Sequence, residues 1–205
     1  MAIPDLDFKH HASPDGWYGT AVYDKAWQYR YMVSYVSRAA GETMTWIMLN
    51  PSTGSHDRMD PTLRRCWAYA RDWGYIGMSV INLYALRATN PQDLRHHHDP
   101  IGPDNDEVID KHLNLQLRAH GKDHLVVCGW GGSTPRRTDR PREVWDRLTA
   151  AGHALTSLGT TASGQPVHPL YLRRSLTPKQ PEYPPRTHKT TLMLEQTSRK
   201  LGRMV

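Results

Sequence analysis

The first third of the chain has the pattern of a β-hairpin. Residues 17–24 and 28–37 are rich in aromatic and β-branched side chains, and a short polar gap separates the two runs. Side chains of these types favour extended backbone, and two such runs joined by a short polar segment are typical of paired strands. We therefore expect an antiparallel hairpin over about 17–37.

Beyond residue 40, short apolar runs alternate with amphipathic segments. The apolar runs predict four buried strands, at 43–49, 77–84, 124–129 and 153–158. Apolar side chains that recur at helical spacing predict helices at 61–73, from about 104, and at about 141–151. Asp60 and Pro61 support the start of the first helix, because aspartate caps helices well and proline suits the first helical position.

Strands that alternate with helices indicate an α/β domain. We expect residues 1–172 to form a three-layer α/β/α domain with a central, mostly parallel four-stranded sheet, to which the antiparallel hairpin is added. Residues 173–205 are predicted to form a basic, proline-containing tail, with room for a short helix over 189–202.

Composition excludes several classes of protein. Hydrophobic residues make up 38% of the 205 positions, and 7 Trp, 10 Tyr and 1 Phe allow a sizeable core. No run of about 18 apolar residues occurs, and the first residues form no apolar leader, so we expect a cytoplasmic protein with no membrane span. Cys66 and Cys128 are too few for a disulfide framework and are expected to be buried thiols.

The net charge of +6 lies in the C-terminal tail. Residues 173–205 hold 8 of the 26 basic and 2 of the 20 acidic residues, which leaves 18 of each in residues 1–172. A basic tail attracts polyanions, so nucleic acid is the expected partner, although a solvated terminus has the same composition. The candidate contacts to a nucleic-acid backbone are Arg64, Arg65, Arg136, Arg137, Arg173 and Arg174.

Polar and aromatic side chains follow the predicted strands, where open α/β sheets bind their ligands. These positions hold Asn50, Pro51, Ser52 and Thr53, then Asn82 and Tyr84, then Trp130 and Gly131, and finally His168. Amides can read a base edge or hold a water, aromatic rings can stack on a planar ligand, and an imidazole can donate a hydrogen bond. Each of these residues is also common as a purely structural element.

Other catalytic signatures are missing from the sequence. It contains no Gly-x-x-x-x-Gly-Lys phosphate loop, no dinucleotide fingerprint and no Gly-x-Ser-x-Gly nucleophile elbow. The run His96-His97-His98 has the chemistry of a metal ligand set. However, it lies in a long polar loop without a cysteine or a regularly spaced histidine partner, so we expect no metal and no cofactor.

The order of motifs resembles a family of bacterial and phage proteins, the domain-of-unknown-function family numbered 1643. The resemblance extends over roughly residues 20–172, and the family has no known activity. The motifs are 48–53 (MLNPST), 60–66 (DPTLRRC), 73–75 (WGY), 82–84 (NLY), 87–89 (RAT), 102–106 (GPDND), 130–131 (WG) and 168–172 (HPLYL).

The same order is similar to that of the uracil-DNA glycosylase superfamily. There an Asp-Pro or Asn-Pro element positions the attacking water, a strand-end Asn reads the flipped base, and a His-Pro element donates to the departing base. The resemblance implies these roles for Asn50, Asn82 and His168, with DNA rather than RNA as the partner. Three positions depart from the superfamily pattern, namely Met48, Ser52 and Leu170.

The leading hypothesis is a glycosylase-like hydrolase that acts on a damaged, deaminated or modified base in DNA. In this hypothesis Pro51, Ser52, Thr53, Tyr84, Trp130 and Gly131 surround the base. One alternative is a non-catalytic module that binds nucleic acid or a nucleotide, and another is an enzyme that acts on free nucleotides or nucleosides. All three require the side chains of Asn50, Asn82 and His168 to meet at one cavity.

Overall fold

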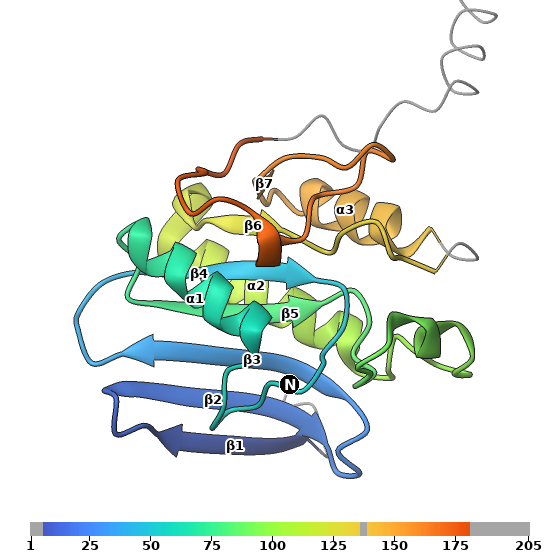
Figure 1. The fold of residues 1–205 in the computed structure, drawn as a ribbon, viewed down its shortest axis with the longest axis horizontal. Helices are drawn as coiled ribbons and strands as arrows, with labels where there is room; N and C mark the ends of the chain where they lie inside the picture. The colour runs from blue at the N-terminus through green and yellow to red at the C-terminus, as the bar shows by residue number, and fades with distance from the viewer. Residues whose placement is uncertain (1–5, 136–138, 181–205) are drawn as a thin grey trace, which may run out of the picture.

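A computed structural model describes residues 6–135 and 139–180 of the protein. Within these residues, one seven-stranded mixed sheet forms the centre of the fold (Figure 1). The strand order is β1-β2-β3-β5-β4-β6-β7. The strands are β1 (Leu6–Ala12), β2 (Trp17–Asp24), β3 (Arg30–Ser37), β4 (Thr43–Met48), β5 (Gly77–Asn82), β6 (Val126–Cys128) and β7 (Leu155–Ser157).

The sheet is antiparallel on one side and parallel on the other. β1, β2, β3 and β5 pair antiparallel in that order, whereas β5, β4, β6 and β7 pair in parallel. The hairpin predicted over 17–37 is confirmed as β2 and β3. The prediction of a central four-stranded, mostly parallel sheet is wrong in extent, because β3 pairs directly with β5 and β1 adds a further strand. The domain is therefore mixed α/β.

Three helices lie close to the predicted positions, and they cover both faces of the sheet (Figure 1). They are α1 (Pro61–Asp72), α2 (Asn105–His120) and α3 (Arg140–Ala150). Asp60 caps α1, since its Oδ1 accepts from the backbone N–H of Leu63 over 2.8 Å. Buried side chains of α1 belong to one core cluster, and those of α2 and α3 belong to the other.

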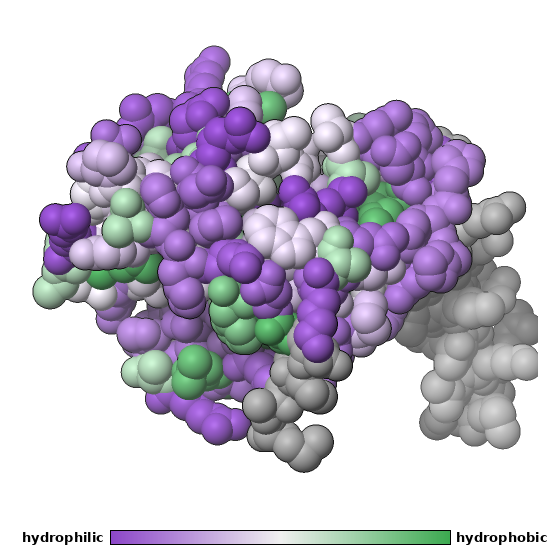
Figure 2. All heavy atoms as spheres, turned by 90° about the horizontal axis from the view of Figure 1, so that it is seen from below, coloured by the Kyte–Doolittle hydropathy of each residue, from purple (hydrophilic) through white to green (hydrophobic). Residues whose placement is uncertain are grey.

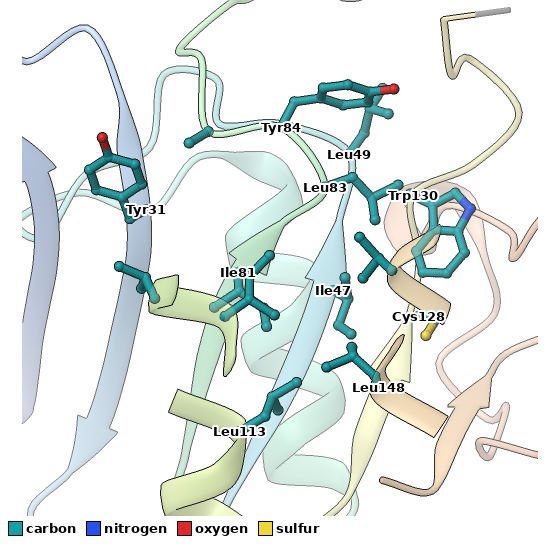
Figure 3. Packing of buried hydrophobic residues seen from close by; sticks show 14 of the residues in the cluster. Tyr31, Ile47, Leu49, Ile81, Leu83, Tyr84, Leu113, Cys128, Trp130 and Leu148 are labelled. Atoms are coloured by element: carbon teal, nitrogen blue, oxygen red, sulfur yellow. The ribbon is translucent and has the colours of Figure 1, made fainter. Parts of the chain in front are cut away.

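The two core clusters follow from the alternation of side chains along the central strand β4. Ile47 points into the cluster beneath α2 and α3, which Figure 3 shows, whereas Trp46 and Met48 point into the cluster beneath α1. Cys66 and Cys128 are both buried and free, one in each cluster. A strand buried on both faces explains why the sequence of β4 is almost continuously apolar.

One face of the protein is largely polar. Figure 2 shows a face on which hydrophilic residues predominate and hydrophobic residues form only small patches. Within residues 6–135 and 139–180, no helix has the length and apolar character needed to cross a bilayer. The tail beyond residue 180, including the helix expected over 189–202, lies outside the described residues, as do Arg136 and Arg137.

Candidate functional site

A cavity of about 300 Å³ lies at the carboxyl ends of β4 and β5. Asn50, Asn82 and His168 all line it, although they are far apart in the sequence. Asn50 follows β4 and Asn82 is the last residue of β5, and these two strands are parallel neighbours. The loop that carries His168 closes another side of the cavity. The three side chains on which the sequence hypotheses depend therefore do share one site.

Asn50 is held in a single orientation by two backbone carbonyls. Its Nδ2 donates to the carbonyl oxygen of Pro51 over 2.9 Å and to that of Ala88 over 2.7 Å. The backbone N–H of Ala88 also donates to the carbonyl of Pro51 over 2.9 Å. Both amide hydrogens are thus used within the protein, and the side-chain oxygen is the atom of Asn50 that a ligand or water can use.

Asn82 contributes a buried amide to the cavity wall. The residue is only 1% exposed, and its Nδ2 has no hydrogen-bond partner among the described residues. Its backbone is fixed from the other face of the sheet, since Nδ2 of Asn105 donates to the carbonyl oxygen of Asn82 over 3.0 Å. A buried donor without a partner is costly, and a ligand that accepts its hydrogen bond removes that cost.

His168 begins the short 3₁₀ helix η3 (Pro169–Tyr171), and its ring contacts the backbone of that helix. The backbone N–H of Leu170 donates to Nδ1 over 3.4 Å. Burial lowers the pKa of His168 below the ordinary histidine value, and the nearby carboxylate of Asp60 opposes this shift. The ring is therefore neutral at neutral pH, with its hydrogen on Nε2.

The loop after β6 is fastened to the loop that carries His168. Gly131 has a φ of 74°, and its N–H donates to the carbonyl of Pro166 over 2.9 Å. A Cβ at this glycine would lie 3.3 Å from Cβ of His168. Nε1 of Trp130 donates to Oε1 of Gln165 over 2.8 Å, so its buried indole also connects the two loops. Trp130 and Gly131 both line the cavity, as does Ser52.

Two charged residues of the cavity were missed in the sequence. Arg30 is 2% exposed, and its guanidinium donates to the carbonyl oxygen of Gly54. It is the first residue of β3, which reaches the cavity edge because β3 runs antiparallel to β5. Asp60 also lines the cavity, where its Oδ2 accepts from the N–H of Gly54 over 3.1 Å. Nothing in the local pattern around Arg30 distinguishes a buried arginine from an exposed one.

The comparison with protein families gives one match. The model described as "Protein of unknown function (DUF1643)" matches residues 30–170. This chain belongs to the DUF1643 family. The match includes the cavity residues from Arg30 to His168. A search of curated proteins finds no match. The family description assigns no activity, so the chemistry of the DUF1643 site has to come from its own residues.

Three of the expected ligand-binding residues of this DUF1643 protein do not line the cavity. Tyr84 is fully buried and packs in the core near Leu49 and Leu83 (Figure 3). The ladder continues past the end of β5, since the N–H of Tyr84 donates to the carbonyl of Leu49, and this directs the ring into the core. Pro51 is buried and Thr53 is exposed. The expected stacking role of Tyr84 in this cavity is therefore wrong.

The predicted backbone-binding arginines of the DUF1643 chain also lie away from the cavity. Arg64 donates to the carbonyl of Met59 over 2.6 Å, and Arg65 lies over the ring of Tyr69. Arg174 forms an ion pair with Asp72, and its Nε lies 2.8 Å from Oδ2. Arg173 is exposed. None of these four residues lines the cavity.

In the histidine run of the DUF1643 chain, His97 makes hydrogen bonds to Gln28 and to the backbone of Asp99. Nε2 of His97 lies 2.9 Å from Nε2 of Gln28, and its Nδ1 accepts from the N–H of Asp99 over 3.1 Å. Across the residues that the structure describes, no group of three His, Cys, Asp or Glu side chains is arranged to hold a metal ion.

Proposed function

We propose that this chain is a glycosylase-like enzyme that binds a nucleobase and hydrolyses its N-glycosidic bond. The observation that carries the proposal is the convergence of Asn50, Asn82 and His168 on one cavity. Its volume of about 300 Å³ suits a base with its sugar at the mouth. The likeness of the motif order to the uracil-DNA glycosylase superfamily supports the same chemistry.

Asn50 positions the water in this proposal. Its fixed side-chain oxygen accepts a hydrogen bond from the water, whose oxygen forms a bond to C1′ of the sugar. The bond between C1′ and the base nitrogen breaks, and its electron pair leaves with the base. An amide is not a base, so the proton that the water loses passes to solvent or to the departing base.

His168 and Asn82 act on the departing base. The neutral imidazole donates from Nε2 to an oxygen on which negative charge develops, and such preorganised donors stabilise the transition state. The amide of Asn82 forms a hydrogen bond to the base edge, and Trp130 supplies an apolar wall. DNA is the proposed partner, since the whole chain carries a net charge of +6.

The test uses purified full-length protein and oligonucleotides that each carry one deaminated, oxidised or alkylated base. Alkaline cleavage of the strand then reports base release. We expect release from at least one oligonucleotide, and a rate lower by about a hundredfold or more in Asn50→Ala and in His168→Ala. Thr53→Ala is the matched control, because Thr53 lies near Asn50 but is exposed and outside the cavity lining. Absence of release from every oligonucleotide contradicts the proposal.

A free nucleoside is the second candidate substrate, because the expected contacts to a DNA backbone, Arg64, Arg65, Arg173 and Arg174, do not line the cavity. A volume of about 300 Å³ is at the small end for ligand sites, and the buried side chain of Met48 forms part of the wall. Hydrolysis of free nucleosides, followed by chromatography, distinguishes this candidate from an enzyme that needs a DNA strand. DNA affinity that falls steeply with salt, with no base released, indicates a binding module instead.

A further inference from the structure

Arg30 is a buried cation without a carboxylate partner among the described residues. Its side chain lines the cavity, and none of the ion pairs within residues 6–135 and 139–180 includes it. The guanidinium donates to the carbonyl of Gly54, but Nε has no hydrogen-bond partner. Buried arginines are normally paired, so an unfilled donor on a fully buried guanidinium indicates an interaction that a ligand completes.

The nearest candidate partner within the protein is already engaged. Asp60 also lines the cavity, but Oδ1 accepts from the N–H of Leu63 and Oδ2 accepts from the N–H of Gly54. These hydrogen bonds fix the carboxylate at the start of α1, where its negative charge interacts favourably with the positive end of the helix dipole. Asp60 therefore acts on Arg30 through its charge and without a direct ion pair, and the Nε hydrogen of Arg30 has no acceptor among the described residues.

The second unfilled donor of the cavity belongs to Asn82. Its Nδ2 is buried and unpartnered, and the residue comes from β5, the strand that pairs with β3. Two neighbouring strands therefore each place a residue with one unpartnered N–H donor in the wall of the same cavity. One buried polar group without a partner is common in proteins. Two such donors in the wall of one ligand-sized cavity indicate a ligand group that has oxygen acceptors and no hydrogens of its own at that position.

We infer that Arg30 and Asn82 form an oxygen-binding subsite, and that the ligand presents carbonyl or acid oxygens to this wall of the cavity. The inference deepens the proposed function and rests on it in taking this cavity as the ligand site. It assigns a specificity-determining role to Arg30, which supplies charge as well as a donor. The shared ligand chemistry is an oxygen acceptor, whether it comes from the oxo group of a base or from a carboxylate or phosphate.

Calorimetric titration of the full chain with four probes tests the subsite. Uracil and cytosine share the ring and its oxygen at position 2. They differ at position 4, where uracil has an oxygen and cytosine an amino group, and at N3, which carries a hydrogen only in uracil. Orotate adds a carboxylate to the uracil ring, and inorganic phosphate supplies acid oxygens alone. We expect uracil to bind about tenfold or more tightly than cytosine, because the amino group at position 4 of cytosine cannot accept a hydrogen bond from either donor, whereas the oxygen of uracil can. Tighter binding of orotate or of phosphate identifies acid oxygens as the source.

Arg30→Met removes the charge and the donors at similar volume. We expect the ratio of the cytosine and uracil dissociation constants to fall from about ten to about one. Arg87→Met is the matched control, since Arg87 also has a buried, unpartnered Nε but does not line the cavity, and its ratio should stay unchanged. The ratio within one variant is independent of its folded fraction, so a purely structural role of Arg30 would not change it.

Three results contradict the subsite. The first is a ratio of cytosine and uracil dissociation constants that Arg30→Met leaves unchanged. The second is equal wild-type affinity for uracil and cytosine with no binding of orotate or phosphate, and the third is binding of none of the four probes. If Arg30→Met does not fold, Arg30→Lys keeps the charge but loses the planar set of donors, so the ratio should fall part of the way towards one, and an unchanged ratio contradicts the subsite in this variant as well. These outcomes are separate from those for the proposed function. Base release with an unchanged ratio overturns only the subsite, and a changed ratio without base release overturns only the glycosylase.

Discussion

The backbone N–H of Leu170 donates to Nδ1 of His168 over 3.4 Å, and this contact decides which ring nitrogen carries the hydrogen. The nitrogen that accepts cannot carry the hydrogen of a neutral imidazole, so the hydrogen lies on Nε2. Pro169 helps to fix the geometry, because it occupies the first position of η3 and makes His168 the capping residue.

Replacement of His168 tests this arrangement. We expect His168→Ala to slow base release by about a hundredfold or more, because a donor that stabilises developing charge is lost. His168→Asn keeps a short N–H donor and should retain more activity than the alanine variant. Single-turnover rates on the best oligonucleotide measure both effects. Equal rates in the wild type and in His168→Ala would remove His168 from the mechanism.

Asn50 should prove structural as well as functional. Asn50→Ala removes the two hydrogen bonds from Nδ2 to the carbonyls of Pro51 and Ala88, and we expect a loss of about 1–3 kcal/mol in the free energy of unfolding. Asn50→Asp should be less stable still, because it places a carboxylate oxygen where those two carbonyls have their donor. Urea unfolding measures both changes, and Thr53→Ala should stay within about 0.5 kcal/mol of wild type.

Local signals in the sequence were enough for the elements that carry the candidate site. Asp60 and Pro61 marked the start of α1, and the apolar runs located β4 and β5. Since parallel strands end at the same edge of a sheet, the positions of Asn50 and Asn82 at one cavity could also be predicted. In the structure both residues line one cavity, as predicted. Their chemical roles stay predictions.

What the sequence could not supply depends on contacts between distant segments. The antiparallel pairing of β3 with β5 and the addition of β1 are set by tertiary packing, which the alternation within a single strand does not encode. The same pairing buries Arg30 at the cavity. Tyr84 was expected at the ligand because it ends the apolar run 77–84, whereas its N–H still pairs with the carbonyl of Leu49 and its ring is buried in the core.

Gly131 allows the loop after β6 to approach His168. Its φ of 74° is unfavourable for other residues, and a Cβ would lie 3.3 Å from Cβ of His168. We expect Gly131→Ala to cost about 1–2 kcal/mol of stability and to reduce activity by displacing the imidazole. Gly132→Ala is the matched control, because its φ is not in the left-handed region and its nearest contact is 3.7 Å. Equal melting temperatures for the two variants would contradict this account.

Acid should destabilise the protein through a histidine pair at the opposite end of the sheet. Oγ1 of Thr45, in β4, lies 3.0 Å from Nε2 of His112 and 2.9 Å from Nε2 of His124. Burial lowers the pKa of both histidines to about 4, with smaller contributions from His124 to His112 and from His120 and His153 to His124. The single hydroxyl donates to one ring and accepts from the other, which requires at least one neutral imidazole.

Because the pKa values of His112 and His124 are lower in the folded protein than in the unfolded chain, acid favours the unfolded chain. The unfolded chain binds protons near pH 6.5, whereas the folded protein binds them only near pH 4, so stability is fully present above 6.5 and falls as the pH drops towards 4. We expect each histidine to contribute on the order of 2 kcal/mol to this loss. Urea unfolding at pH 7.0 and at pH 4.5 measures it. His112→Gln keeps an amide near Thr45 but cannot titrate, so its loss between the two pH values should be smaller than that of wild type. If the two losses are equal, His112 is not one of the groups that make the fold sensitive to acid.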